Sequence, residues 1–248
     1  MLTRYLRSPR PLWLSLVLLP LVWTVPSARA QVSAASGEAS LGSTVNGVLG
    51  GSCTTGLCVV GGGTAAGGNQ FHRLSDFNTS GAIQGVRFDN QGFSNTIVGV
   101  TNPYGAYIDK IVSLAQPGNL LFLAPGGIRL AGSAGFVQVN QLGLSTATSV
   151  AIGTRQFNVF GTTAAQARAL SGAPQLGAIG LQVDGAARQT AGITGVPGIE
   201  LDGISISVDR ELLVDAVDGA ARVNNATLAV QPWQGQGGSL SILGEQVL

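Results

Sequence analysis

Apolar positions recur at an almost constant interval along this chain, and this spacing limits the folds that the chain can adopt. One series is equally spaced in the sequence: Val86, Ile108, Leu130 and Ile152. A second series advances at a slightly longer interval: Leu181 and Val183, Ile204 and Ile206, Leu228 and Val230. Repeats of roughly 20 to 50 residues are typical of solenoids, in which every repeat buries its apolar face against its neighbours.

The residues around these positions alternate between apolar and polar side chains. Every second residue is apolar in the segments "VRFD", "IRL", "VQV", "ISISVD" and "SLSI". A period of two is typical of strands that bury one face. One turn of a right-handed parallel β-helix needs about as many residues as one interval of these series for its short strands and turns. We therefore expect an all-β, right-handed, single-stranded parallel β-helix with an N-terminal cap; a β-sandwich is the alternative.

The composition agrees with a folded chain of many short strands. The 248 residues include 37 glycines, 45% are hydrophobic and 10% are charged. Disordered chains are poor in apolar residues and rich in charge, so this chain is of the opposite kind. The best helical signal is "TTAAQARALSG" at Thr162–Gly172, which has a threonine for a cap, several alanines and a closing glycine. It predicts one short helix or a loop.

The N-terminal segment, 1–30, has the layout of a secretory signal peptide. Three arginines precede an apolar core from Leu12 to Val25, and "ARA" at Ala28 to Ala30 fits an A-x-A cleavage site. We expect cleavage here rather than an uncleaved anchor. The leader contains four of the 13 basic residues, so the remaining charge is 9 − 12 = −3. Nucleic acid is not an expected partner, because it calls for clustered lysine and arginine.

Neither the cysteines nor the glycine-rich segment indicates a cofactor or a metal. Cys53 and Cys58 are the two cysteines of a chain with an export signal, which favours a disulfide. Two cysteines and the distant His72 make an incomplete set of zinc ligands. The segment "GGGTAAGG", Gly61 to Gly68, lacks the helix and the Gly-Lys-Ser/Thr ending of nucleotide-binding loops.

A late group of carboxylates provides the argument for an enzyme. Alternation would place Glu200 and Asp202 on one strand face, and Asp209 and Glu211 likewise. Lyases and hydrolases with a parallel β-helix use acidic pairs or bound Ca²⁺ on such an outer face. Outward residues of a solenoid are polar in any case, so we expect a solvated surface. An extracellular β-helix polysaccharide lyase or hydrolase is the alternative function.

Three stretches between about Leu41 and Phe160 resemble the N-terminal secretion domain of the filamentous haemagglutinin family, the exoproteins of two-partner secretion. They are "GGNQFHRLSDFN" at Gly67–Asn78, "NLLFLAPGGIRLAGSAGFVQV" at Asn119–Val139 and "LGLSTATSVAIGTRQF" at Leu142–Phe157. "TNPYG", at Thr101–Gly105, adds an Asn-Pro pair. Departures from the family pattern occur at Gln70, Leu74, Ala124 and Gly126.

The resemblance implies a parallel β-helix exported by the Sec route and then recognised by an outer-membrane β-barrel transporter with POTRA-type domains. It implies a non-enzymatic, adhesin- or haemagglutinin-like protein, secreted or at the cell surface, with host or surface glycans as further partners. The expected organisation is a signal peptide at 1–30, a secretion domain at 31–160 and further coils at 161–248. Truncation of a longer exoprotein is left open.

The resemblance also selects residues for transporter recognition or domain folding. They are Asn69, Phe71, His72, Phe77, Asn102, Pro103, Asn119, Pro125 and Gly127. We expect no catalytic triad around His72, because a triad requires groups that converge in space and Arg73, Ser75 and Asp76 are merely its neighbours in sequence. Phe71, Leu74 and Phe77 are expected to pack, with Asn69 and His72 hydrogen-bonded near a turn. In "APGGI", a type II turn would require positive φ at Gly126 or Gly127.

Overall fold

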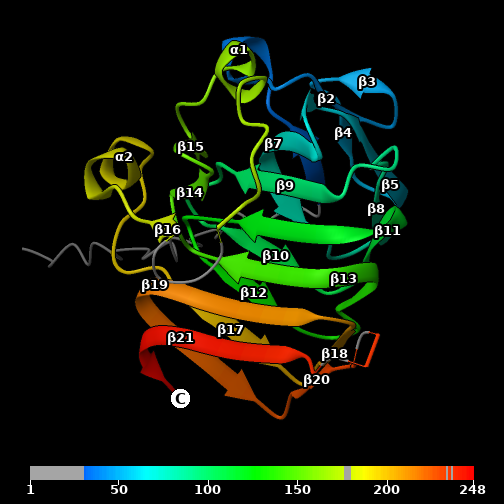
Figure 1. The fold of residues 1–248 in the computed structure, drawn as a ribbon, viewed down its shortest axis with the longest axis vertical. Coiled ribbons are helices and arrows are strands. Elements are labelled where there is room, and N and C mark those ends of the chain that lie inside the picture. The colour runs from blue at the N-terminus through cyan, green and yellow to red at the C-terminus, as the bar shows by residue number, and fades with distance from the viewer. Residues whose placement is uncertain (1–30, 176–179, 233, 236) are drawn as a thin grey trace, which may run out of the picture.

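The computed structural model describes residues 31–175, 180–232, 234–235 and 237–248 (Figure 1). The expected signal peptide, 1–30, lies outside the described residues. The described chain is a β-solenoid whose coils stack along the long axis of the molecule. The strands of successive coils pair in parallel along the sides of the solenoid, and we call these sides ladders 1, 2 and 3.

Ladder 1 forms the first side, and all of its pairs are parallel. Its strands are β5 (Gly56–Gly62), β8 (Ile83–Phe88) and the first parts of β11 (Ile111–Leu123) and β13 (Gly135–Ser145). Two later strands, β18 (Ser205–Val208) and β20 (Thr227–Val230), form a separate parallel pair, and β18 lies beside β13.

Ladder 2 has the longest paired segments of the three ladders, and its pairs are also parallel. Its strands are the first part of β7 (Asn69–Asn78), β9 (Asn95–Val100), the second parts of β11 and β13, and the first parts of β19 (Glu211–Asn224) and β21 (Ser239–Val247). A row of polar residues begins this ladder: Asn69, Asn95, Asn119, Gln141, Glu211 and Ser239.

Ladder 3 closes each coil with a third parallel side. Its strands are the end of β7, β10 (Ala106–Ile108), β12 (Ile128–Leu130), β17 (Ile199–Asp202), the second part of β19 and the end of β21. The expected all-β parallel β-helix is therefore confirmed, and the alternative β-sandwich is excluded by the parallel pairing of successive coils.

The spacing of the first predicted series is correct for one pair and wrong for the others. Ile108 and Leu130 are register partners in ladder 3, on successive coils. Val86 belongs to ladder 1, and Ile152 lies outside the coils in an antiparallel sheet. The coils differ in length because their turns differ in length. Residues at a constant interval in the sequence therefore fall on different ladders.

The second predicted series is shifted by two residues along the strand. Ile206 pairs with Leu228, whereas the predicted partner of Leu228 was Ile204. Leu181 lies in the antiparallel sheet outside the coils. Apolar residues two positions apart on a strand are equivalent in a periodicity argument, so sequence alone could not fix this register.

Antiparallel strands cover the N-terminal edge of all three ladders. β2 (Ser43–Val45) and β3 (Val48–Leu49) cover β5 of ladder 1, and β6 (Thr64–Ala66) covers the start of β7 in ladder 2. β1 (Gln31–Ala34) and β4 (Ser52–Cys53) cover the end of β7 in ladder 3. Together with the 3-10 helix η1 (Gly37–Ala39), they form the expected N-terminal cap, which protects the first coil from pairing with other chains.

The described residues of 146–198 lie outside the coils and form an insertion against ladder 2. Its elements are β14 (Ser149–Ile152), β15 (Arg155–Asn158), α1 (Ala164–Ala167), β16 (Leu181–Gln182) and α2 (Gly185–Thr190). The three strands form an antiparallel sheet. Helix α1 lies where one short helix was predicted and begins with a capping box between Thr163 and Gln166. The further coils expected after Gly161 begin only at β17.

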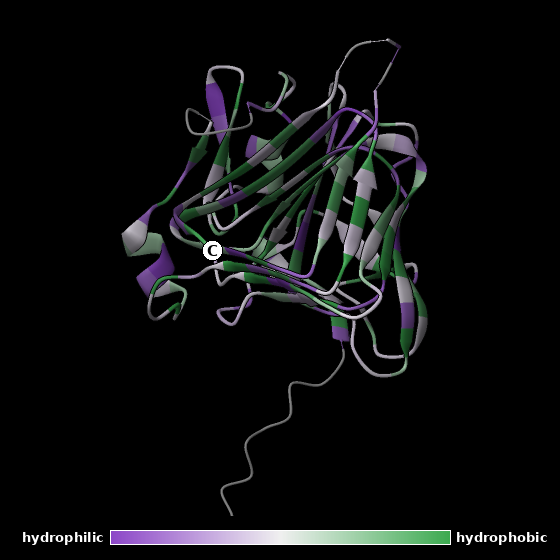
Figure 2. Ribbon diagram, turned by 90° about the horizontal axis from the view of Figure 1, so that it is seen from below, coloured by the Kyte–Doolittle hydropathy of each residue, from purple (hydrophilic) through white to green (hydrophobic). Residues whose placement is uncertain are grey.

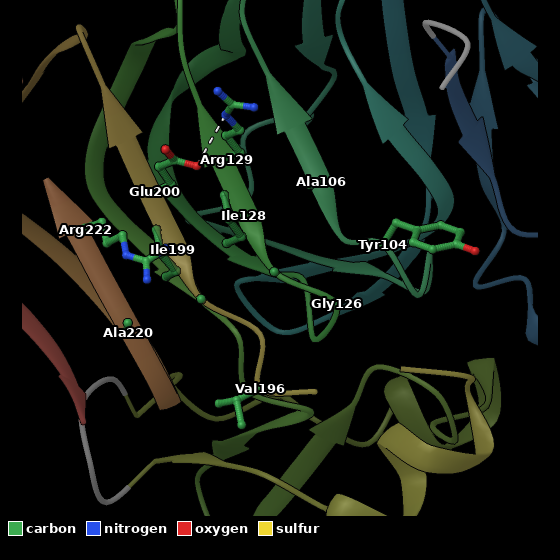
Figure 3. A pocket seen from close by; sticks show the side chains of 12 residues that line it. Tyr104, Ala106, Gly126, Ile128, Arg129, Val196, Ile199, Glu200, Ala220 and Arg222 are labelled. Atoms are coloured by element: carbon green, nitrogen blue, oxygen red, sulfur yellow. Dashed lines mark ion pairs between the residues drawn. The ribbon is translucent and has the colours of Figure 1, made fainter. Parts of the chain in front are cut away.

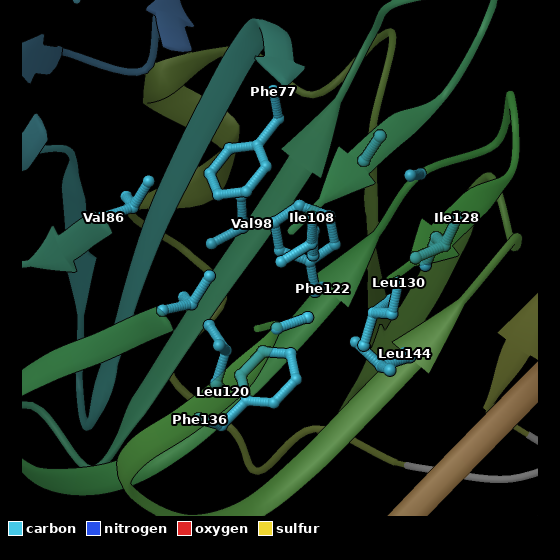
Figure 4. Packing of buried hydrophobic residues seen from close by; sticks show 14 of the residues in the cluster. Phe77, Val86, Val98, Ile108, Leu120, Phe122, Ile128, Leu130, Phe136 and Leu144 are labelled. Atoms are coloured by element: carbon cyan, nitrogen blue, oxygen red, sulfur yellow. The ribbon is translucent and has the colours of Figure 1, made fainter. Parts of the chain in front are cut away.

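Two hydrophobic cores result from this arrangement. The main core fills the solenoid, where Phe77, Phe122 and Phe136 pack among aliphatic side chains from all three ladders (Figure 4). Seen along the long axis, hydrophobic and hydrophilic residues alternate along the strands, as the period of two requires (Figure 2). The second core lies between the outer face of ladder 2 and the insertion, and includes Phe71 and Phe157. The strands of ladder 2 from β7 to β19 are therefore covered on both faces.

Candidate functional site

A ladder of amide side chains begins in strand β7, the strand that carries the first stretch of the family resemblance. Asn95 Nδ2 donates a hydrogen bond of 2.8 Å to Asn69 Oδ1, and Asn119 Nδ2 donates one of 2.8 Å to Asn95 Oδ1. Asn69 Nδ2 donates to the carbonyl oxygens of Leu170 and Gly172, at 2.8 and 2.7 Å. The predicted motif residues Asn69 and Asn119 thus help to join the first three strands of ladder 2 to one another and to the insertion.

Arg73 connects β7 to the cap and to the insertion at the same time. Its side chain is buried, with 1% of the residue exposed. The guanidinium donates to the carbonyl oxygen of Ala39 at 2.8 Å, of Asn158 at 3.1 Å and of Thr162 at 2.7 Å. Burial lowers the pKa of Arg73 to about 10, so the group still carries its charge at neutral pH. A buried charge is tolerated where carbonyl dipoles of this kind replace water.

His72 faces the interior of the solenoid next to Phe88. Its Nδ1 lies 3.4 Å from Ser43 Oγ, and the ring centroids of His72 and Phe88 are 5.7 Å apart. Ser43 Oγ also accepts a hydrogen bond of 3.2 Å from the Arg73 N–H, so its own hydrogen can be donated to Nδ1. Complete burial lowers the pKa of His72 to about 4. The imidazole is therefore neutral at physiological pH and hydrogen-bonded to the cap.

The polar neighbours of His72 on β7 make their contacts elsewhere. Asp76 Oδ1 accepts a hydrogen bond of 3.0 Å from Asn102 Nδ2. Ser75 Oγ lies 3.5 Å from the carbonyl oxygens of Ser33 and Ala34. His72, Ser75 and Asp76 are therefore not assembled as a triad, and the hydroxyl that does contact His72 is buried with it.

The aromatic residues of β7 divide between the two cores. Phe77 lies edge-on to Phe122 with ring centroids 4.9 Å apart, and it stacks against Phe88 at 6.3 Å. Phe71 points to the other face, where its centroid is 5.2 Å from that of Phe157 in the insertion. β7 therefore packs against the coils and against the insertion, whereas the sequence led us to expect contact with the coils alone.

The Asn-Pro segment at 102–105 and the Ala-Pro segment at 124–127 form two stacked turns at the corner that leads into ladder 3. The Gly105 N–H donates to the Asn102 carbonyl and the Gly127 N–H to the Ala124 carbonyl, both at 2.9 Å. The Ala106 N–H then donates to the Gly127 carbonyl at 2.9 Å, which connects one turn to the next. Pro103 and Pro125 occupy the second position of each turn.

The positive φ predicted for "APGGI" is found at Gly127, where φ is +112°. The predicted type II geometry is wrong, because it needs positive φ at Gly126, the third position of the turn, and positive φ occurs at the fourth position instead. Gly105 has the same place in the upstream turn and a φ of +79°. The two turns share one conformation, and this allows them to stack.

The cysteines strengthen the cap. Cys53 in β4 and Cys58 in β5 form a disulfide, with Cα atoms 5.7 Å apart. The bond joins the strand that covers β1 to the first strand of ladder 1. Both residues are buried and belong to the main core.

The late carboxylates have separate environments. Glu200 Oε2 is 3.4 Å from Arg129 Nε, and Glu211 accepts a hydrogen bond of 3.3 Å from Gln141 Nε2. Glu200 and Asp202 share the outer face of β17, as predicted. The face predicted for Asp209 and Glu211 is wrong, because Asp209 follows β18 and Glu211 begins β19, across a corner.

Within the part of the chain that the structure describes, no group of three or more histidine, cysteine or acidic side chains is placed to hold a metal ion. No helix of the described residues is long and apolar enough to cross a membrane.

These contacts define a capped parallel β-solenoid in which the motif residues chiefly hold the first coils, the cap and the insertion together. No protein-family model matches the sequence, and no curated protein matches it. Among the solved structures, the chain is similar to one described as "Crystal structure of filamentous hemagglutinin secretion domain". The two share 13% sequence identity with a TM-score of 0.39, over 86% of this chain and 99% of the other. The similarity concerns the fold.

Proposed function

We propose that this chain is the β-helical secretion domain of a two-partner secretion exoprotein, without enzymatic activity. In this proposal an outer-membrane β-barrel transporter with POTRA-type domains recognises the domain and exports it. The protein then acts in adhesion, secreted or at the cell surface. The proposed organisation has a signal peptide at 1–30, a secretion domain at 31–160, and a remainder at 161–248 that continues the helix from β17 onward.

The proposal rests on the position in the fold of the three stretches that resemble the filamentous haemagglutinin family. The stretch at 67–78 contains β7, the stretch at 119–139 contains the second part of β11, and the stretch at 142–157 contains the second part of β13. With β9 between the first two, these are consecutive strands of ladder 2. Stretches that are far apart in the sequence thus form one continuous core, as a single folding unit requires.

The export route can be tested in the native host. Each gene for a POTRA-containing outer-membrane transporter would be deleted in turn, and the protein would be measured in the medium, on the cell surface and in the periplasm. We expect one deletion to remove the protein from the medium and the cell surface, and a plasmid copy of that transporter to restore it. A protein exported by another route serves as the control. Unchanged export in every deletion strain would contradict the proposal.

A variant can separate recognition by the transporter from folding. Asn119→Ala removes one rung of the amide ladder, and we expect it to lower stability by about 1 kcal/mol. Export of this variant would be compared with that of variants elsewhere that lose the same stability. A larger loss of export than in those variants would assign Asn119 to recognition, and an equal loss would assign it to folding.

A further inference from the structure

A groove of about 290 Å³ crosses the corner at which the chain enters ladder 3 (Figure 3). Its walls include Tyr104 and Arg222, which lie toward opposite ends of the view, and Arg129 between them. The volume is at the lower end of the range for small-molecule sites, so the groove suits a short ligand.

The floor of the groove is main chain, because the turns beneath it stack too closely for side chains. A Cβ atom on Gly126 would lie 2.6 Å from the Asn102 carbonyl oxygen, and one on Gly198 would lie 2.7 Å from the Ala220 carbonyl oxygen. A ligand can therefore approach the peptide groups of the corner directly. Bare main chain alone would not define a site, and the side chains around it supply the chemistry.

The walls present one guanidinium that is free to bind an anion. Arg129 is engaged, since its Nε is 3.4 Å from Glu200 Oε2 and its guanidinium carbon is 5.8 Å from the centroid of the Tyr107 ring. Arg129, Glu200 and Arg222 lie in register on three successive strands of ladder 3, and Arg222 is exposed. Its guanidinium makes no hydrogen bond or ion pair with any residue that the structure describes. A planar guanidinium of this kind pairs with a carboxylate through two parallel hydrogen bonds.

The charge of the groove limits how acidic its ligand can be. Arg129 and Arg222 contribute two positive charges and Glu200 one negative charge, so the net charge of these walls is +1. The Glu200 carboxylate next to Arg222 repels a second negative group. The walls thus favour a ligand with one anionic group over a densely sulfated or phosphorylated one.

Tyr104 supplies a flat apolar surface beside this charge. It stands at the tip of the Asn102–Gly105 turn with 92% of its surface exposed. A tyrosine ring presents a rigid apolar face and a polar hydroxyl, which suits a ligand with an apolar face edged by hydroxyl groups. A pyranose ring has this character.

A peptide fits the groove poorly. Extended peptides bind by adding a strand to a free sheet edge. The strands at this corner, β10, β12, β17 and the second part of β19, are each paired on both sides within ladder 3. The corner offers hydrogen-bonding groups to a ligand without offering an edge.

We propose that this groove binds a saccharide that carries one carboxylate. The carboxylate pairs with Arg222, the apolar face of a sugar ring packs on Tyr104, and hydroxyl groups contact the main chain of the floor. The site gives a ligand class to the adhesion part of the proposed function. Its binding in solution does not depend on export, so the two proposals can fail separately.

The experiment is calorimetric titration of the purified, folded chain. The probes are 3′-sialyllactose and glucuronosyl-xylobiose, which carry one carboxylate each, with lactose and the methyl ester of glucuronosyl-xylobiose as their neutral counterparts. We expect at least one acidic saccharide to bind saturably, and its neutral counterpart to bind at least about tenfold more weakly, because the charge-assisted pair is lost. Addition of salt should weaken the binding.

Three variants locate the binding. Arg222→Gln and Tyr104→Ala change exposed side chains and should remain folded, with each weakening the binding by about tenfold or more. The matched control is Arg87→Gln, an exposed arginine on ladder 1, which should bind as the parent does. The proposal is overturned if neither acidic saccharide binds, if neutral counterparts bind equally, or if Arg87→Gln has the same effect. Displacement of the sugar by an acidic hexapeptide of higher affinity would assign the groove to peptides and also overturn it.

Discussion

At the residue scale, His72 makes the stability of this protein sensitive to acid. Its folded pKa of about 4 lies below the ordinary value of 6.5 because the ring is buried. Below pH 6.5 the unfolded chain takes up a proton that the folded chain refuses until the pH approaches 4. The free energy of unfolding should therefore fall as the pH drops through this window, by roughly 3 kcal/mol in total.

Urea denaturation between pH 7 and pH 4 measures this dependence, and His72→Gln is the comparison, since it keeps a polar side chain that does not titrate. We expect the variant to be less stable at pH 7 and to lose less stability on acidification. Burial raises the pKa values of Asp76 and Asp215, which act in the opposite direction, so the difference between parent and variant is the informative quantity. Equal slopes would contradict the assignment.

The sequence was a good guide to what His72 does not do and a poor guide to what it contacts. A triad could be rejected because neighbouring residues on one strand rarely converge in space. The contact with Ser43 could not be foreseen, because Ser43 lies far upstream and reaches His72 through an antiparallel cap. Arg73 was passed over for a similar reason: its partners Asn158 and Thr162 belong to the insertion, whose position the alternation pattern does not encode.

At the element scale, the stacked turns before ladder 3 should tolerate no side chain at Gly105. Gly105 and Gly92 have φ values of +79° and +81°, so alanine is strained equally at both. A Cβ on Gly105 would lie 2.1 Å from the Gly127 carbonyl oxygen, whereas a Cβ on Gly92 meets nothing within 4 Å. We expect Gly92→Ala to cost about 1 kcal/mol and Gly105→Ala to cost at least about 2 kcal/mol more.

Thermal or urea unfolding of the two alanine variants checks this prediction. The pair isolates the close approach of the turns from the conformational preference of glycine, since both sites have nearly the same φ. A similar loss of stability in both variants would show that the turns can move apart, and would argue against tight stacking at this corner.

Alternation predicted short strands well, because each face of a strand has one environment. "VRFD", "IRL" and "ISISVD" coincide with parts of β8, β12 and β18. It did not predict that β11 and β13 each continue from ladder 1 into ladder 2, since the alternation is interrupted at the bend between them. Alternation also gave no sign that the strands of ladder 2 from β7 to β19 are covered on both faces. A different pattern did indicate this: "NLLFLA" at Asn119–Ala124 is almost continuously apolar, as a strand buried on both faces requires.

At the scale of the whole molecule, Arg73 joins strand β7, the cap and the insertion through a single side chain. Arg73→Met keeps the length of the side chain and removes the donors to Ala39, Asn158 and Thr162. We expect the free energy of unfolding to fall by about 3 kcal/mol or more, because buried carbonyl oxygens lose charge-assisted hydrogen bonds. Hydrogen exchange should accelerate in the cap and in the insertion together.

The matched control is Arg168→Met, at an exposed position after helix α1, which should change stability by no more than about 0.5 kcal/mol. Faster exchange in the insertion alone, with the cap unaffected, would show that Arg73 does not couple the two parts.

The hydrogen bonds of Asn69 and Arg73 to the insertion also constrain the order in which the chain can fold. Their partners lie far downstream in the sequence, so the first coil has a high contact order even though a solenoid is built mainly from neighbouring repeats. A chain that emerges N-terminus first, from a ribosome or a pore, cannot satisfy the buried guanidinium of Arg73 until Thr162 has emerged, or complete the contacts of Asn69 until Gly172 has. The first coil of this molecule therefore cannot complete its folding as it emerges, but only after the insertion has followed it.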